Sequence, residues 1–257
     1  MMKNEQLFTG KGQNYTNARP GYPKECLDLL KTRYSFGQGT VIADIGSGTG
    51  IFTSQLLALG ASVYAVEPNA DMRRYADERL SGMTGFHSVN GLAEQTTLPD
   101  RSVDHVTVAQ AFHWFDPAAF KTECRRILKP GGKVFLLWNL RVEDAPVSAQ
   151  CAEVFAKYCP RFKGYNTGMK AGDRRIAEFY DGHYSEYAFE NPLTYDEEHF
   201  VERYLSSSYS LRENEANYRE CMEEVIRIFR RFETDGRVTV PNRTYLYAGS
   251  IYESSSD

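Results

Sequence analysis

The sequence has no long apolar run and no excess of positive charge. No segment approaches the ~18 consecutive apolar residues of a transmembrane helix, and the polar N-terminus lacks the basic stretch and apolar run of a secretory leader. Acidic residues outnumber basic ones by 34 to 30, which gives a net charge of -4 and a pI near 5.8. We therefore expect a cytoplasmic protein with neither a membrane nor a nucleic-acid partner, because nucleic acid usually calls for a basic face.

Paired cysteines and internal repeats are also missing. The five cysteines include no C-x-x-C pair, and their odd number and spacing predict reduced, mostly buried thiols rather than a disulfide framework or a metal site. With 257 residues, 42% of them hydrophobic and 25% charged, the chain has an ordinary globular composition. Its length suits one enlarged domain or a core with a smaller cap.

One stretch with a recognisable pattern is present at residues 41–50. A short apolar run ends at Asp44, and Gly46, Gly48 and Gly50 follow at alternate positions, with Ser47 between the first two. Residues 51–59 then have helical spacing, so the pattern predicts a strand, a tight turn and a helix. Glycines suit such a turn because they leave the backbone open to a ligand and permit positive φ. The helix N-terminus beside them favours an anionic or polar group.

A second acidic marker follows on the next expected strand. Residues 61–66 alternate in polarity and lead to Glu67, which Pro68 follows. Glu67 lies about 20 residues beyond the first glycine, where folds of this type hold a ribose by its hydroxyls. The glycines read G-x-G-x-G rather than the G-x-G-x-x-G of dinucleotide-binding proteins, which counts against a nicotinamide cofactor.

Three further segments extend the pattern at residues 91–104, 109–116 (AQAFHWFD) and 128–132 (LKPGG). Together with residues 41–67 they resemble the class I S-adenosylmethionine (SAM)-dependent methyltransferases. The resemblance is to small-molecule enzymes such as those of trans-aconitate and of the ubiquinone and menaquinone pathways. It covers residues 8–140 well and is thin beyond them. It implies SAM as the cofactor, S-adenosylhomocysteine as the product and a small-molecule methyl acceptor as the partner.

The resemblance and the alternation of strands and helices imply an α/β fold. We expect a Rossmann-like, doubly wound, mostly parallel seven-stranded sheet with an antiparallel edge pair and a helical cap insertion. In this division residues 1–140 form the SAM-binding core with an N-terminal lid segment, and residues 141–180 form the cap insertion. Residues 181–257 supply the last two strands and further cap helices within 206–235.

Helix-capping residues, prolines and apolar patterns predict where the individual helices and strands lie. Asn69 and Asp116 are expected to cap helices over residues 70–80 and 117–128, and Pro23 is expected to start a helix that ends near residue 34. A capping box over residues 194–197 predicts a helix start. Further expected elements are helices over residues 147–158, 172–179 and 214–232, strands over 86–89, 104–109, 133–140 and 183–189, a turn at Gly131-Gly132 and an extended segment over 244–252.

The resemblance assigns the cofactor-binding residues by position. They are Tyr15, Arg19, Asp44, Gly46, Ser47, Gly48, Gly50, Glu67, Pro68, Ala93, Glu94 and Gln110. Tyr15 and Arg19 would fold over the cofactor as part of the lid, or else belong to a tail that its aromatics pin to the core. Leu92 stands where relatives often have an aspartate for the adenine, so Glu94 or the backbone alone would serve there.

The strand over residues 104–109 delivers His113 and Trp114 to the carboxyl end of the sheet, where ligands of open α/β folds bind. We place these two residues and Trp138 in the substrate pocket. SAM carries an activated methyl group, so the protein need only align an acceptor and exclude water. A carboxylate acceptor needs no base, whereas for a hydroxyl or carbon acid His113 is the first candidate and Tyr15 the second. Packing of Trp114 and a local hydrogen bond of His113 are the structural alternatives.

Other classes are less consistent with the sequence. It lacks the Asn/Asp-Pro-Pro-Tyr/Phe motif of amino-methylating nucleic-acid enzymes, the Pro-Cys nucleophile of cytosine-C5 enzymes and the metal cluster of catechol-type enzymes. An NAD-dependent oxidoreductase and a non-catalytic SAM-binding module are the two alternatives to a small-molecule methyltransferase. The sequence leaves the oligomeric state open between monomer and homodimer.

Overall fold

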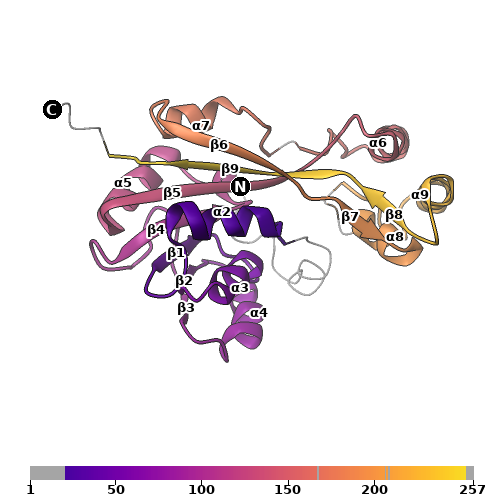
Figure 1. Ribbon diagram of the computed structural model, residues 1–257. Coiled ribbons are helices and arrows are strands. Elements are labelled where there is room, and N and C mark those ends of the chain that lie inside the picture. The colour runs from indigo at the N-terminus through magenta and orange to yellow at the C-terminus, as the bar shows by residue number, and fades with distance from the viewer. Residues whose placement is uncertain (1–20, 167, 206, 208, 253–257) are drawn as a thin grey trace.

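A seven-stranded sheet forms the centre of the molecule (Figure 1). The computed structural model describes residues 21–166, 168–205, 207 and 209–252. The strand order is β3-β2-β1-β4-β5-β9-β6. The strands are β1 (Val41–Ile45), β2 (Ser62–Val66), β3 (Phe86–Val89), β4 (Val103–Ala109), β5 (Leu128–Arg141), β6 (Tyr184–Glu190) and β9 (Asn242–Gly249). Strands β1 to β5 pair in parallel, and β9 runs antiparallel to both β5 and β6. The predicted mostly parallel sheet with an antiparallel edge pair is confirmed.

Helices cover both faces of the sheet. On one face α2 (Lys24–Tyr34), α3 (Ile51–Ala58) and α4 (Ala70–Leu80) share an apolar cluster with the side chains of Ile42 and Phe135. On the other face α5 (Pro117–Ile127) and α7 (Arg174–Phe179) pack against a second cluster of the sheet. The short 3-10 helix η2 (Phe112–Trp114) follows β4. Both faces of the parallel strands are therefore buried, which explains their continuous apolar runs.

Two helix starts follow the predicted capping chemistry. The side chain of Asn69 accepts a hydrogen bond from the backbone N–H of Met72 at 3.0 Å. One carboxylate oxygen of Asp116 accepts from the N–H groups of Ala118 and Ala119, and Pro117 occupies the first turn. These caps satisfy donors that the first turn of a helix otherwise leaves unpaired.

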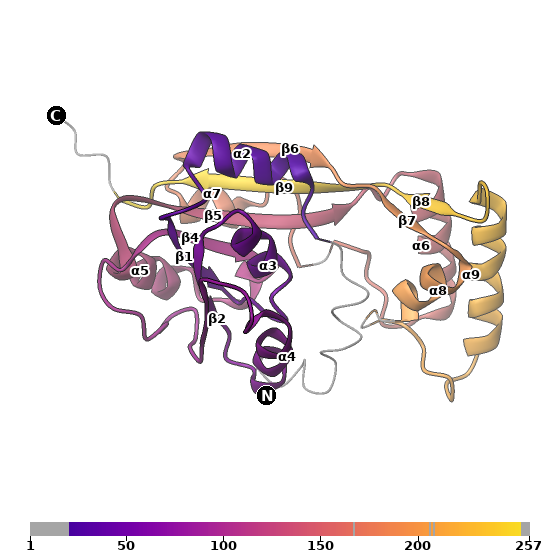
Figure 2. The ribbon, with the colours of Figure 1, turned by 60° about the horizontal axis from the view of Figure 1, so that its bottom comes forward.

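A smaller body lies beyond the ends of β5 and β9 (Figures 1 and 2). It consists of helices α6 (Pro146–Tyr158), α8 (Glu197–Leu205) and α9 (Tyr218–Phe232) and a two-stranded sheet of β7 (Leu193–Tyr195) and β8 (Val238–Val240). We call these five elements the cap. They share an apolar cluster of their own. Pro192 and Pro241 stand between the main sheet and the small sheet, where a residue without an N–H interrupts the pairing.

Helix α7 lies within the segment expected to be cap, residues 141–180, yet it packs on the main sheet beside α5. Helix α8 precedes the second expected cap segment, residues 206–235, yet it belongs to the apolar cluster of the cap. The division of the chain into a core and a cap therefore stays a proposal, with α7 assigned to the core and α8 to the cap.

Two local predictions were wrong. Thr194 was expected to cap a helix, but it lies in β7, where its hydroxyl is 3.1 Å from that of Thr239. Asp196 caps α8 instead, accepting from the N–H of His199. The Gly131-Gly132 turn does not precede the strand but lies inside β5, which already begins at Leu128. Pairing with β4 passes from Val103 and Leu128 to His105 and Lys133, so the turn forms an irregularity in the strand.

The five cysteines all lie in described residues and are buried free thiols. Burial raises the pKa of the Cys26 thiol to about 12. Within the part of the chain that the structure describes, no group of three or more His, Cys, Asp or Glu side chains is arranged to hold a metal ion. Among the described helices, none combines the length and apolar character needed to cross a bilayer.

Candidate functional site

The glycine turn connects β1 to α3 with left-handed backbone at each glycine. The φ angles of Gly46, Gly48 and Gly50 are 68°, 58° and 78°. The N–H groups of Gly46 and Ser47 donate to the carbonyl of Val66, at 2.8 and 3.2 Å, and so tie the turn to the end of β2. Glycine is favoured at such φ values because a Cβ is strained there.

The three glycines differ in what surrounds them. A Cβ on Gly46 would lie 2.6 Å from the Cβ of Ala111, and a Cβ on Gly50 would lie 2.5 Å from a methyl group of Leu80. A Cβ on Gly48 would meet no atom of the described residues within 4 Å. Packing therefore explains two of the glycines, whereas Gly48 faces open space that a ligand can enter.

The carboxylate of Glu67 lies directly at this turn. It accepts from the N–H of Gly48 at 3.0 Å and from the N–H of Asn69 at 2.9 Å. The hydroxyls of Ser47 and Thr49 are buried, and neither has a hydrogen-bond partner among the described residues. Buried hydroxyls normally have partners, so the turn suits a polar ligand.

Asp44 lies beneath the turn. Its carboxylate accepts from the hydroxyls of Thr53, at 2.6 Å, and Thr107, at 2.9 Å, and the residue is only 1% exposed. Burial raises the pKa of Asp44 to about 6, partly offset by these two hydrogen bonds. The geometry gives Asp44 a supporting position under the turn, while its contact with a cofactor stays a prediction.

We expect the Asp44→Asn substitution to change how stability depends on pH. The folded-state pKa of about 6 lies above the ordinary aspartate value of 3.8, so the contribution of Asp44 is fully present below pH 3.8 and is lost as the pH rises through 6. The difference in unfolding free energy between wild type and variant should therefore shift by on the order of 2–3 kcal/mol from about pH 4 to about pH 7, in favour of the variant. Urea unfolding across this window measures it, and a constant difference would contradict the raised pKa of Asp44.

The loop after β3 is tightly folded. Leu92 and Gln95 exchange two backbone hydrogen bonds of 3.1 and 3.2 Å, and Ala93 is buried between them. The carboxylate of Glu94 accepts from the N–H of Asp116 at 2.9 Å, which ties the loop to the start of α5. Pro68 is half-buried next to Glu67. The roles of Pro68, Ala93 and Glu94 in binding a cofactor stay predictions.

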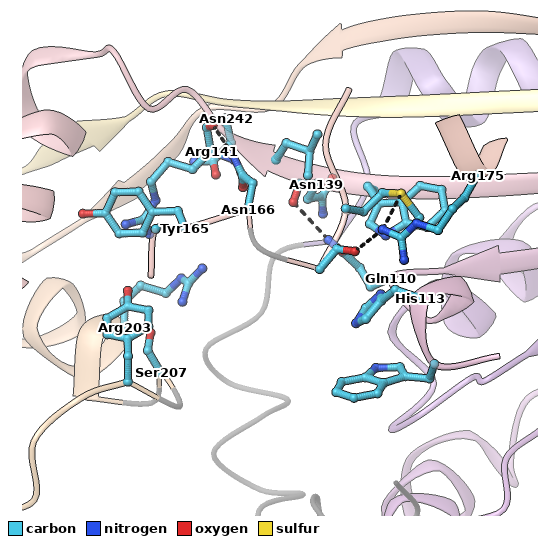
Figure 3. Close-up of a pocket in the computed structure, with 17 residues that line it drawn as sticks. Gln110, His113, Asn139, Arg141, Tyr165, Asn166, Arg175, Arg203, Ser207 and Asn242 are labelled. Atoms are coloured by element: carbon cyan, nitrogen blue, oxygen red, sulfur yellow. Dashed lines mark hydrogen bonds between the residues drawn. The ribbon is translucent and has the colours of Figure 1, made fainter. Parts of the chain in front are cut away.

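A cavity of about 560 Å³ opens at the carboxyl ends of β4 and β5, between the sheet and the cap (Figure 3). It brings together Gln110, His113, Trp114 and Trp138, which the sequence placed at the substrate side or the cofactor site. Gln110 has a φ of 63° and donates from its side chain to the carbonyl of Asn139 at 3.2 Å. Strained backbone of this kind is often found at functional sites.

Other residues of the cavity wall were missed by the sequence reading. Arg141 and Asn166 contribute from the end of β5 and the segment after α6, and Tyr165, Arg203 and Tyr209 add side chains from the cap region. The one signal available was Arg141 itself, a charged residue that ends the otherwise apolar run over residues 134–140. Tyr15 and Arg19, the predicted lid residues, lie outside the described residues.

The fold is that of the class I methyltransferases. Its features are the mostly parallel sheet, the glycine turn after β1 with Glu67 at the end of β2, and the cavity beside them. Comparison with known proteins identifies the family. Residues 43–136 match the family model described as a methyltransferase domain. An uncharacterized methyltransferase-like protein of Schizosaccharomyces pombe is 30% identical over 212 residues, which cover 79% of this chain and 78% of that protein. The chain therefore belongs to the class I SAM-dependent methyltransferase family.

Two further matches differ in extent. An uncharacterized methyltransferase of Mycobacterium tuberculosis strain H37Rv is 40% identical over 143 residues, so the match spans only 56% of the length of either protein. The solved structure of a candidate type II methyltransferase from Anaeromyxobacter dehalogenans has the same fold, with a TM-score of 0.61. It is 22% identical and covers 91% of this chain and 98% of that one.

Proposed function

We propose that this protein transfers a methyl group from SAM to a small-molecule acceptor. The observation that carries the proposal is the Glu67 carboxylate, which accepts from the N–H of Gly48 beside an open turn. The buried hydroxyls of Ser47 and Thr49, which have no hydrogen-bond partner within the described ranges, fit a polar ligand at the same place. Family membership supports SAM as that ligand.

Particular residues would hold each part of the cofactor. Glu67 would accept from the ribose hydroxyls, and the backbone of Gly48 would approach the ligand closely. The N-terminus of α3 presents backbone N–H groups to a polar or charged group, because the first turn of a helix leaves such donors unpaired. The loop with Ala93 and Glu94 would contact the adenine. Bound SAM supplies a methyl group that its sulfonium already activates.

The acceptor would enter the cavity between the sheet and the cap. Gln110 directly follows β4 near the glycine turn and also lines the cavity, so it connects the two sites. Trp114 and Trp138 provide apolar surface that excludes water. His113 would take the proton of a hydroxyl or carbon acid, whereas a carboxylate acceptor needs no base. We further propose a cytoplasmic location, a monomer or homodimer, and no nucleic-acid or membrane partner.

Calorimetric titration with SAM, S-adenosylhomocysteine and NADH tests the proposal. We expect micromolar binding of the first two, and we expect Glu67→Ala to weaken it by roughly 1–3 kcal/mol through the lost hydrogen bonds. Glu78→Ala is the matched control, because Glu78 is exposed on α4 and pairs with Arg74 at 2.8 Å. It should leave binding unchanged.

The alternatives give distinct results. Binding of NADH in place of SAM would support an oxidoreductase and reject the methyltransferase proposal. SAM binding without formation of S-adenosylhomocysteine from any screened acceptor would support a non-catalytic SAM-binding module. Acceptor screening is therefore the second step, after the cofactor has been established.

A further inference from the structure

Arg141 is a buried cation at the wall of the cavity. The residue is 8% exposed, and within the described residues its guanidinium forms no ion pair. Its Nη1 atom is buried and has no hydrogen-bond partner in the described part of the chain. Buried charges in proteins are normally paired, because an unpaired one loses its hydration without compensation. Arg141 is therefore a buried cation without an acidic partner among the described residues.

Aromatic rings provide part of the compensation. The guanidinium carbon lies 4.2 Å from the centre of the Tyr165 ring and 5.1 Å from that of Tyr204. Burial opposes the charge on Arg141, but attraction to Tyr204, Tyr165 and Tyr209 outweighs it and holds the pKa above its ordinary value. Even desolvated cation–π contacts offset only part of the cost of burying an ion. They fix the orientation of the cation and leave it available to an anion.

Positive side chains line the cavity, although the chain carries a net charge of -4. Three arginines contribute, Arg141, Arg175 and Arg203, and no aspartate or glutamate is among the described residues that form the wall. Arg175 is neutralised by Asp173 at 2.8 Å. Arg141 lies on the side opposite Gln110 and His113 (Figure 3). A cavity lined by one sign of charge concentrates ligands of the other sign.

The sheet register locates Arg141 relative to the expected methyl donor. Ala109 of β4 pairs with Leu137 of β5, so Gln110 is level with Trp138. Arg141 follows three residues later, about 10 Å further along the strand. Asn166 holds this end of β5, because its side-chain oxygen accepts from the N–H of Arg141 at 3.2 Å and its side-chain nitrogen donates to the carbonyl at 3.0 Å. The cation is thus built into a fixed position away from the cofactor side.

We propose that the acceptor carries a carboxylate that Arg141 holds, apart from the atom that is methylated. This inference rests on the proposed methyltransferase function. A planar guanidinium pairs with a carboxylate through two parallel hydrogen bonds. The held carboxylate is a recognition group and not the nucleophile, because the hydrogen bonds from the guanidinium engage its lone pairs and lower their nucleophilicity. The acceptor therefore has two ends, an anionic one at Arg141 at the end of β5 and a reactive one beside His113.

The two tryptophans of the chain, Trp114 and Trp138, both line the cavity and report its occupancy. Their fluorescence is followed while straight-chain monocarboxylates and dicarboxylates, from butanoate to decanedioate, are added in the presence of saturating S-adenosylhomocysteine. Each acid is compared with its neutral amide at the same pH. We expect at least one acid to bind about tenfold or more tightly than its amide, as one charge-assisted pair provides.

Substitutions test whether Arg141 causes the preference for the acid over the amide. Arg141→Met keeps the length of the side chain but removes the charge, and it should abolish the preference for the acid while leaving S-adenosylhomocysteine binding unchanged. Arg230→Met is the matched control, because Arg230 belongs to the cap but is exposed and pairs with Glu197. It should keep the preference. Arg141→Lys should retain part of it, because the charge remains and the paired geometry is lost.

Three results would overturn the inference. They are equal binding of every acid and its amide by the wild type, an unchanged preference in Arg141→Met, and a loss of S-adenosylhomocysteine binding in Arg141→Met, which would assign the guanidinium to the carboxylate of the cofactor. The comparison of acid with amide needs no variant and so does not depend on whether Arg141→Met folds. Failure of the wild type to bind S-adenosylhomocysteine at all would instead reject the proposed function.

Discussion

Alanine at Gly48 is expected to weaken S-adenosylhomocysteine binding by on the order of 100-fold while the protein stays folded. The described part of the chain has room for the added methyl group, since none of its atoms lies within 4 Å of the place that a Cβ would take at φ 58°. The cost to stability should be the left-handed strain alone, about 1–2 kcal/mol. In the complex the methyl group would occupy the space of the ligand and separate it from the N–H groups of the turn. Loss of about two hydrogen bonds of roughly 1–3 kcal/mol each gives about this factor.

Two other glycines serve as controls for Gly48→Ala. Gly131 has a φ of 82° and open surroundings in β5, so Gly131→Ala should cost similar stability and leave ligand affinity unchanged. Gly46→Ala should lower the thermal stability of the protein itself, because its Cβ would lie 2.6 Å from that of Ala111. Calorimetry and thermal unfolding of the three variants separate these effects. Wild-type affinity in Gly48→Ala would show that no ligand contacts this part of the turn.

The fold of residues 41–140 could be predicted because local signals and the global architecture agree there. Each strand reads as an apolar run, and the caps at Asn69 and Asp116 have the expected hydrogen bonds. The prediction failed at Thr194, where a capping box and a strand compete for the same residues. Pairing of β7 with β8 decides the outcome, and residues 193–195 and 238–240 are too far apart in sequence for a local signal to anticipate it.

The positions in the fold of the candidate site residues on the core could be predicted as well, while their roles stay predictions. The turn, Glu67 and the residues after β4 follow from motifs, because their positions are fixed by adjacent strand ends. The wall of the cavity that contains Arg141, Tyr165 and Arg203 depends on how the cap lies against the sheet, which no motif encodes. A single charged residue at the end of an apolar strand is ambiguous in sequence. In the structure Arg141 is buried between the rings of Tyr165 and Tyr204, without a carboxylate partner among the described residues. This environment identifies it as a candidate anion-binding residue.

Replacement of His113 is expected to lower kcat by about 100-fold or more when the acceptor reacts through a hydroxyl or a carbon acid. A positioned general base contributes roughly 10²–10⁴ to such a rate. His113 lines the cavity from η2, next to Trp114, at a ring-centroid distance of 4.7 Å. His113→Ala and His113→Gln are measured at saturating SAM and acceptor, by formation of S-adenosylhomocysteine. KM should change little, because the loss falls on the transition state.

The pH dependence and a control residue distinguish a base from a packing residue. The His113 ring packs closely against Gly168, because a Cβ on Gly168 would lie only 3.2 Å from it. His113 therefore also fills space, and His113→Gln preserves much of its side-chain volume. If His113 is the base, both variants lose the rise of kcat with pH that proton abstraction produces, whereas a packing defect would spare His113→Gln. His87→Ala, on exposed β3 at the far edge of the sheet, should leave kcat unchanged. Unchanged turnover in both His113 variants would show that His113 is not the general base. It would indicate an acceptor whose reacting atom is already anionic.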